Sequence, residues 1–197
     1  MIYIYTKKFP NIIFLIEKTT YKIFKIGYNP KHLGALLKYG TLISEVNGNI
    51  ERAIAYFNQA LQIDPDNFVA NFRLGQIYLE KQKNFQIALT YFKRIVEIRD
   101  KYWPGYFFLY LCYKELLDWL KCEQSLQSVL LLEPEFLKGW KHLGLLYMEI
   151  SEYKKALRVW QKANQIFYQQ KDEDILNSIA DCQYQLEEYD EAIFSYK

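Results

Sequence analysis

The side chains that most often carry catalysis or hold metals are scarce in this sequence. His32 and His142 are its two histidines, and neither belongs to an HExxH pair or to a His/Cys cluster with the spacing of metal ligands. Cys112, Cys122 and Cys182 are odd in number and form no Cys-x-x-Cys pair, which argues against a disulfide framework. We therefore expect two solvent-facing histidines, three buried thiols, and no metal site or cofactor.

Motifs of nucleotide-binding and hydrolytic enzymes are missing as well. The chain has no Gly-x4-Gly-Lys-Ser/Thr loop, no Gly-x-Gly-x-x-Gly turn and no Gly-x-Ser-x-Gly elbow. Glu187 and Glu188 form an adjacent acidic pair, but they fall on an expected helix–helix turn, where carboxylates usually face water. We predict that the protein is not an enzyme, has no catalytic residues and takes no small-molecule substrate.

Charge and hydropathy narrow the class of partner. Lys and Arg number 25 against 23 for Asp and Glu, so the net charge of +2 gives no reason to expect a nucleic-acid partner. The longest uncharged run, Tyr102 to Tyr113, has twelve residues, whereas a membrane-spanning helix needs about 20. This run predicts a helix that is buried on most sides.

Helical periodicity is the strongest pattern in the chain. Between residues 140 and 163, small and apolar residues recur at three- and four-residue spacing in two blocks, which indicates two amphipathic helices. The positions are Trp140, Leu143, Gly144 and Tyr147, then Ala156, Trp160 and Ala163. Four other stretches of the sequence repeat the same pattern.

The distance from one pair of helices to the next is nearly constant. A small residue begins the apolar stripe of each second helix, in steps of 35, 34, 34 and 36 residues: Ala53, Ala88, Cys122, Ala156 and Ala192. Candidate N-caps stand four residues before three of them, at Asn49, Asn84 and Asp118. Pro65 and Pro134 stand where one helix must end, and Asp66 is the expected next N-cap. We predict an all-α chain of helix pairs.

The residues from Trp140 to Ala163, and their counterparts upstream, resemble the tetratricopeptide repeat family over about residues 30–197. The resemblance implies a right-handed superhelical α-solenoid of antiparallel helix pairs. Small residues would let paired helices approach, and large residues would fill the space between repeats. Three positions depart from the family pattern: Asn71 replaces a large residue, Tyr110 a small one and Gln183 an aromatic one. The first two repeats also carry one extra residue between their helices.

The same resemblance sets the expected boundaries. Residues 1–28 form a non-repeat N-terminal segment, and residues 29–197 form the array, with repeats at about 29–66, 67–101, 102–135, 136–171 and a truncated 172–197. Because the last helix stops at Lys197, we expect either a longer array or a partner that covers this end. For residues 1–28 we favour a helix that caps the first repeat. A membrane-surface anchor and an incorrect gene start are the alternatives.

In the family that the chain resembles, the first helix of each repeat lines a concave groove. The corresponding partner-binding positions here are Phe72, Gln76, Leu79, Phe107, Leu111, Lys114, Lys138, Lys141, Leu145, Met148 and Asp181, together with Asp174. This groove would be apolar in the middle, basic in the fourth repeat and acidic in the fifth. Such a surface suits an amphipathic helix or an extended peptide with an acidic end.

We therefore predict a non-catalytic protein–protein interaction scaffold, or adaptor, that binds a peptide or helix of a protein partner. Two alternatives stay open: the recognition arm of a larger enzyme such as a glycosyltransferase, and a membrane-associated assembly factor. Membrane contact is expected, if at all, only through residues 1–28. The odd cysteine count and the lack of an Asn-x-Ser/Thr sequon favour a cytoplasmic location and leave an organellar one open.

Overall fold

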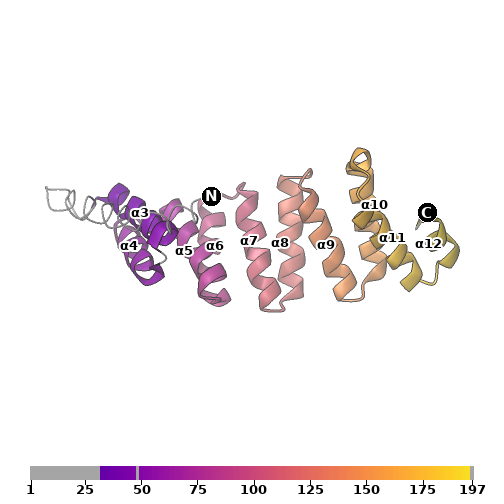
Figure 1. Ribbon diagram of the computed structural model, residues 1–197, viewed down its shortest axis with the longest axis horizontal. Helices are drawn as coiled ribbons and strands as arrows, with labels where there is room; N and C mark the ends of the chain where they lie inside the picture. Colours follow the sequence, from indigo (N-terminus) through magenta and orange to yellow (C-terminus); the bar gives the residue numbers. More distant parts are fainter. Residues whose placement is uncertain (1–31, 48, 196–197) are drawn as a thin grey trace, which may run out of the picture. The chain divides into compact units, whose positions relative to one another are not determined.

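The computed structural model describes residues 32–47 and 49–195, and within them the chain is helical, with no β-strand. Consecutive helices pack as antiparallel pairs (Figure 1), namely α3 with α4, α5 with α6, α7 with α8, α9 with α10 and α11 with α12. The chain divides into two compact units between Ile98 and Arg99. The predicted all-α fold is confirmed, whereas the expected cap helix in residues 1–28 lies outside the described residues.

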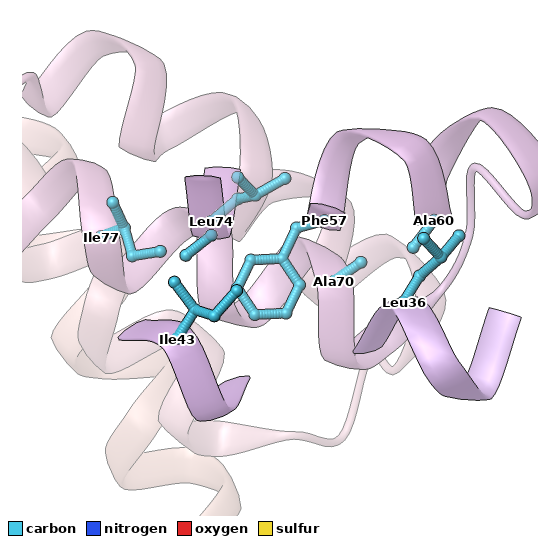
Figure 2. Close-up of a cluster of buried hydrophobic side chains, with 8 residues drawn as sticks. Leu36, Ile43, Phe57, Ala60, Ala70, Leu74 and Ile77 are labelled. Atoms are coloured by element: carbon cyan, nitrogen blue, oxygen red, sulfur yellow. The ribbon is translucent and has the colours of Figure 1, made fainter. Parts of the chain in front are cut away.

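The first unit contains two described helix pairs. In the first pair, α3 (Leu33–Leu42) runs into a π-helix, η1 (Ile43–Asn47), and is followed by α4 (Ile50–Ile63). In the second, α5 (Phe68–Gln76) runs into the π-helix η2 (Ile77–Lys81) and is followed by α6 (Phe85–Ile98). The two pairs share one core: Figure 2 shows Phe57 of α4 among side chains from both, namely Leu36, Ile43, Ala70, Leu74 and Ile77.

The second unit contains three helix pairs. They are α7 (Trp103–Glu115) with α8 (Trp119–Leu132), α9 (Leu137–Glu149) with α10 (Tyr153–Ile166), and α11 (Glu173–Gln185) with α12 (Tyr189–Ser195). A short 3-10 helix, η3 (Tyr168–Gln170), joins α10 to α11. The uncharged run from Tyr102 to Tyr113 lies almost entirely in α7, as predicted.

Side-chain caps confirm the predicted starts of the second helices. Each cap accepts a hydrogen bond from the backbone N–H three residues later, at 3.0 Å for Asn49, 3.1 Å for Asn84 and 3.2 Å for Asp118. The expected cap at Asp66 is wrong by one residue. Asn67 accepts from the N–H of Ala70 at 3.1 Å, while the N–H of Asp66 donates to Asp64 in the preceding turn.

A glycine facing an aromatic ring sets the separation of the helices in three pairs. The rings of Phe57, Phe92 and Trp160 pack against the first helices at Gly40, Gly75 and Gly144. A Cβ atom at Gly40 or Gly75 would lie 2.8 Å from the ring, and one at Gly144 would lie closer still. Distances of this kind are far inside van der Waals contact, so only glycine permits this approach of the two helices.

The third helix pair reverses this arrangement. Tyr110 of α7 stands at the glycine position, and Leu126 of α8 stands at the position of the ring. Both side chains are buried, with exposures of 2% and 0%. The large side chain has therefore moved from the second helix to the first, which keeps the space between the helices filled.

The two π-helices accommodate the extra residue of the first two repeats. In the second unit, the N–H of the residue that caps each second helix donates to a carbonyl five residues earlier: Asp118 to Tyr113, Glu152 to Tyr147 and Glu188 to Gln183. In the first unit, Asn84 donates to Tyr78, six residues earlier, at 2.8 Å. The extra residue widens the last turn of the first helix, as π-turns do, and the second helix still begins on its cap.

Asn71 makes a hydrogen bond like that of the larger Trp140, which stands at the same place in the fourth repeat. In α9, Nε1 of Trp140 donates to the carbonyl of Pro134 at 2.8 Å. In α5, Nδ2 of Asn71 donates to the carbonyl of Pro65 at 3.0 Å. Both side chains thus join the first turns of their helix to the proline six residues earlier, so the substitution keeps the contact with less buried volume.

His142 does not face water as expected. It is half-buried, with Nδ1 3.2 Å from the hydroxyl of Tyr110 and its ring near those of Tyr110 and Phe107. Burial, assisted by the positive charges of Lys138 and Lys114, lowers the pKa of His142 to about 4. The reason for the difference is the reversed pair, since Tyr110 fills the glycine position and its hydroxyl reaches α9.

Substituting Gly144 tests the glycine–ring contact. Gly144→Ala should lower the free energy of unfolding by about 1–3 kcal/mol, because the new methyl group overlaps the indole of Trp160. Alanine's higher helix propensity, about 1 kcal/mol, offsets only part of this loss. Urea unfolding followed by circular dichroism measures the change. Gly34→Ala is the control, because its Cβ would meet only the His32 side chain, at 3.3 Å. Equal effects of the two substitutions would contradict a steric role.

A double-mutant cycle tests the reversed pair. Tyr110→Gly should cost about 4 kcal/mol or more through the cavity it leaves and its lower helix propensity. Leu126→Trp alone should cost about 1–3 kcal/mol through overpacking. The double variant restores the arrangement seen at Gly144 and Trp160, so its cost should fall short of the sum by about 1 kcal/mol or more. Additive costs would show that the two positions do not compensate each other.

Protonation of His142 should make the protein less stable in mild acid. The pKa is about 4 in the folded chain and about 6.5 when unfolded, so between these values the unfolded state binds more protons. The free energy of unfolding should fall by about 1–2 kcal/mol as pH drops from about 6.5 to 4, a figure reduced for solvent screening because His142 is only half-buried. Carboxylates contribute to the same profile, so the comparison is with His142→Gln across this range. Parallel profiles for the two proteins would rule out the effect.

Candidate functional site

A polar pocket of about 330 Å³ lies in the first unit, between its two described helix pairs. Its walls come from η1, the start of α4, α5 and η2, and the lining residues are Ser44, Glu45, Ile50, Arg73, Gln76, Ile77, Glu80 and Lys81. Both π-helices therefore supply residues to the same pocket. The π-helices that hold the extra residue of the first two repeats thus also contribute to the walls of the pocket.

An ion pair crosses the pocket. Nη2 of Arg73 lies 3.1 Å from Oε1 of Glu45, and the two side chains are 35% and 55% exposed. A guanidinium carries five N–H donors in a rigid fork, so this contact leaves further donors on a residue that lines the pocket. Gln76 adds an amide, which can donate and accept at once. The pocket can therefore bind a peptide group or a polar side chain through directed hydrogen bonds.

The other expected groove residues of the first unit differ in exposure. Phe72 is half-buried and makes an edge contact with the ring of Phe92, with 6.3 Å between centroids. Leu79 is buried, with 7% exposure, so its expected place on the groove surface is wrong. Leu79 lies within η2, and the wider π-turn changes the direction of the residues that follow Gln76.

The first helices of the second unit expose an apolar surface with cations at its edge. Leu145 is 51% exposed, Phe107 and Leu111 are half-buried, and Lys114 is exposed. Lys138 holds its Nζ 5.6 Å from the centroid of the Phe107 ring, a cation–π contact. This mixture of apolar and basic side chains can accept an amphipathic segment.

Two other expected groove residues of this unit, Met148 and Asp181, differ in exposure. The thioether of Met148 accepts a hydrogen bond from Trp160 at 3.4 Å, and the Met148 side chain is half-buried. Asp181 is exposed on α11. The expected groove residues of the second unit therefore include contacts of the core as well as surface groups.

Lys141 and Asp174, expected to meet a partner with opposite charges, pair with each other instead. Nζ of Lys141 lies 2.8 Å from Oδ2 of both Asp172 and Asp174. Burial alone would lower the pKa of Lys141, but the two carboxylates outweigh it and the pKa is raised. This bridge joins α9 to the start of α11. Lys138 is therefore the exposed lysine of the region that was predicted to be basic, and Lys114 of the preceding repeat is exposed as well.

The cysteines are buried, as predicted. Cys112, Cys122 and Cys182 are free thiols, and burial raises their pKa values to about 12, 12 and 11. Thiols of this kind are protonated and unreactive at neutral pH. In the part of the chain that the structure describes, no three His, Cys, Asp or Glu residues gather as metal ligands. Within the same residues, no helix combines the length and apolar character that crossing a membrane requires.

Sequence reasoning missed Glu45 and Arg73, which form the ion pair of the pocket. The available sign was the spacing between the small residues of the paired helices. It is 13 residues from Gly40 to Ala53 and from Gly75 to Ala88, against 12 from Gly144 to Ala156. An extra residue at the same place in two successive repeats indicates a shared local structure. It does not indicate which side chains that structure brings together.

Comparisons with known proteins agree with this architecture. Residues 47–82 match the family described as TPR repeat, and residues 69–99 match the family described as Tetratricopeptide repeat. The chain is 25% identical over 123 residues to the tetratricopeptide repeat-containing protein trd-1 of Caenorhabditis elegans. That match covers 62% of this chain and 16% of trd-1, so the chain spans a small part of this relative.

Solved structures show the same fold. A crystal structure of MamA has a TM-score of 0.72 at 20% identity and covers 83% of this chain and 87% of its own. YrrB, described as a TPR protein with an unusual peptide-binding site, has a TM-score of 0.71 at 17% identity and covers 89% and 88%. MamA from Desulfovibrio magneticus RS-1 has a TM-score of 0.63 at 25% identity and covers 72% and 79%. The two family matches over residues 47–99 and the match to trd-1 identify tetratricopeptide repeats in this chain, and the solved structures show that its fold is the fold of such repeats.

Proposed function

We propose that this chain is a non-catalytic scaffold that holds a peptide or helix of a protein partner against its first helices. The family and the folds of its structural neighbours support an interaction scaffold. The pocket between the first two helix pairs carries the finer proposal. In it, Arg73, Glu45 and Gln76 offer donors and acceptors around one hollow.

The polarity of this pocket favours a main-chain or polar group of the partner. Ile50 and Ile77 are the apolar lining residues, and the remaining six are polar or charged. The carboxylates of Glu45 and Glu80 balance the cations of Arg73 and Lys81, so no net charge selects a strongly charged ligand. A side-chain amide such as that of Gln76 matches the donor and acceptor of a peptide group.

The second unit would bind an apolar part of the partner. Leu145 and Phe107 supply the apolar contact, while Lys138 and Lys114 supply the positive charge beside it. A helix or extended segment with apolar residues and flanking carboxylates satisfies both features. We further propose that the protein works inside the cell and that the partner is a protein rather than nucleic acid.

Site-specific photocrosslinking tests which helices face the partner. We would place p-benzoylphenylalanine at Gln76 of α5 and Leu145 of α9, and at the exposed Gln86 of α6 and Gln127 of α8 as matched controls. In extract of the source organism, the first two positions should crosslink to a common protein and the controls should not. Crosslinks mainly from Gln86 and Gln127 would overturn the proposal.

The crosslinked segment, made as a labelled peptide, then tests the pocket itself. Fluorescence anisotropy should show at least about tenfold weaker binding for Arg73→Ala, because a guanidinium at the centre of an interface is a typical hot spot. Arg94→Ala is the control, since Arg94 is an arginine of α6 that pairs with Asp66 and Glu97 outside the pocket. Equal binding by both variants would remove the pocket from the proposed site.

A further inference from the structure

Opposite charges are strongly segregated in the last part of the chain. Residues 153–171 contain five Lys or Arg and no Asp or Glu: Lys154, Lys155, Arg158, Lys162 and Lys171. Residues 172–196 contain eight Asp or Glu and no Lys or Arg: Asp172, Glu173, Asp174, Asp181, Glu187, Glu188, Asp190 and Glu191. The net charge of +2 for the whole chain conceals this division.

The positive charges form a stripe on one face of α10. Lys154, Arg158 and Lys162 follow one another at four-residue spacing and are all exposed, so they line up over about 12 Å of one helix face. The opposite face, with Ala156, Trp160 and Ala163, is buried. We call these three residues the basic stripe.

The basic stripe has no acidic partner among the described residues. The ion pair that α10 forms within them is between Lys155 and Glu152, at 3.8 Å. Lys162 donates to the amide oxygen of Gln165, which carries no charge. Like charges at four-residue spacing repel one another on a helix. The stripe is therefore a surface on which an opposing anionic group would relieve repulsion and add attraction.

The negative charges are most concentrated at the turn between α11 and α12. Glu187, Glu188, Asp190 and Glu191 lie within five residues and are all exposed. None of them forms an ion pair with another described residue of the chain. We call these four residues the acidic turn. The four carboxylates of this short segment are opposite in sign to the three cations of the basic stripe.

Two tyrosines accompany the acidic turn. Tyr184 and Tyr189 are 58% and 52% exposed, and their rings meet edge to face with 5.5 Å between centroids. Aromatic faces beside carboxylates favour contact with Lys and Arg side chains, whose cations attract the ring and whose stems cover it. The acidic turn therefore combines charge and shape suited to a row of basic side chains.

We propose that this protein self-associates, with the acidic turn of one copy docked on the basic stripe of a second copy. The chain itself provides both halves of a complementary pair, and neither half forms an ion pair with the rest of the chain that the structure describes, apart from its own short-range contacts. Because the contact joins different patches of the two copies, a head-to-tail arrangement of it can propagate from copy to copy. Because the charges are exposed, the attraction is screened by salt, and association depends on ionic strength.

Sedimentation velocity of the full 197-residue chain tests this proposal. Association should be seen at about 50 mM NaCl. It should weaken by at least about tenfold at about 500 mM, where the Debye length is shorter than the length of the basic stripe. The stripe variant K154E/R158E/K162E and the turn variant E187K/E188K/D190K/E191K should each be monomeric. An equimolar mixture of the two should associate again, because the turn retained by one meets the stripe retained by the other.

Controls separate a specific contact from a general charge effect. K38E/K83E/K93E makes the same change in net charge at three exposed lysines of the first unit and should still self-associate. Circular dichroism of every variant checks that it is folded. Recovery of association on mixing would also show that the stripe and turn variants are folded. A monomeric wild-type chain at low salt, an unaffected stripe variant, or a mixture that stays monomeric would overturn the proposal. A monomeric chain that binds phosphatidylserine vesicles through the stripe would assign this surface to lipid instead.

Discussion

The contact between a glycine and an aromatic ring determines how closely the paired helices approach, and most other features of this structure depend on it. At Gly40, Gly75 and Gly144 the ring occupies the space that a Cβ atom would need. Phe57 also packs against Ala70 and Leu74 of the following pair. One side chain therefore sets the distance within a pair and contributes to stacking between pairs, which a single repeat could not achieve alone.

Other parts of each repeat vary while this contact is kept. The first unit carries one extra residue per repeat, and the π-turns η1 and η2 absorb it between the ring contact and the cap of the second helix. In the third pair the large side chain moves to the first helix as Tyr110, and the volume between the helices stays filled. The fold thus constrains the total volume at the contact more strongly than the identity of either residue.

Much of this architecture could be predicted from sequence because it repeats. The caps at Asn49, Asn84 and Asp118 follow from local hydrogen-bonding chemistry, and the helix pairs follow from periodicity. The burial of His142 and Leu79 and the ion pairs of Lys141 could not be predicted in this way. His142 depends on a hydroxyl that reaches it from Tyr110, 32 residues away, and Lys141 depends on carboxylates of the next pair. Leu79 turns inward because of a π-turn that periodicity does not register.

The residues that differ most between repeats are those that the ring contact does not constrain. Lys141 forms its ion pairs within the protein, because its Nζ lies 2.8 Å from a carboxylate oxygen of each of two aspartates. Gln183 likewise uses its amide within the protein, since the amide accepts a hydrogen bond from Ser195 at 2.7 Å. Arg73 has one ion pair and a partly exposed guanidinium beside the pocket, and Lys154 and Arg158 form no ion pair with a described residue. In a fold built from near-identical units, a polar group whose bonding capacity is used internally supports stacking, and one whose capacity is unused is available for recognition.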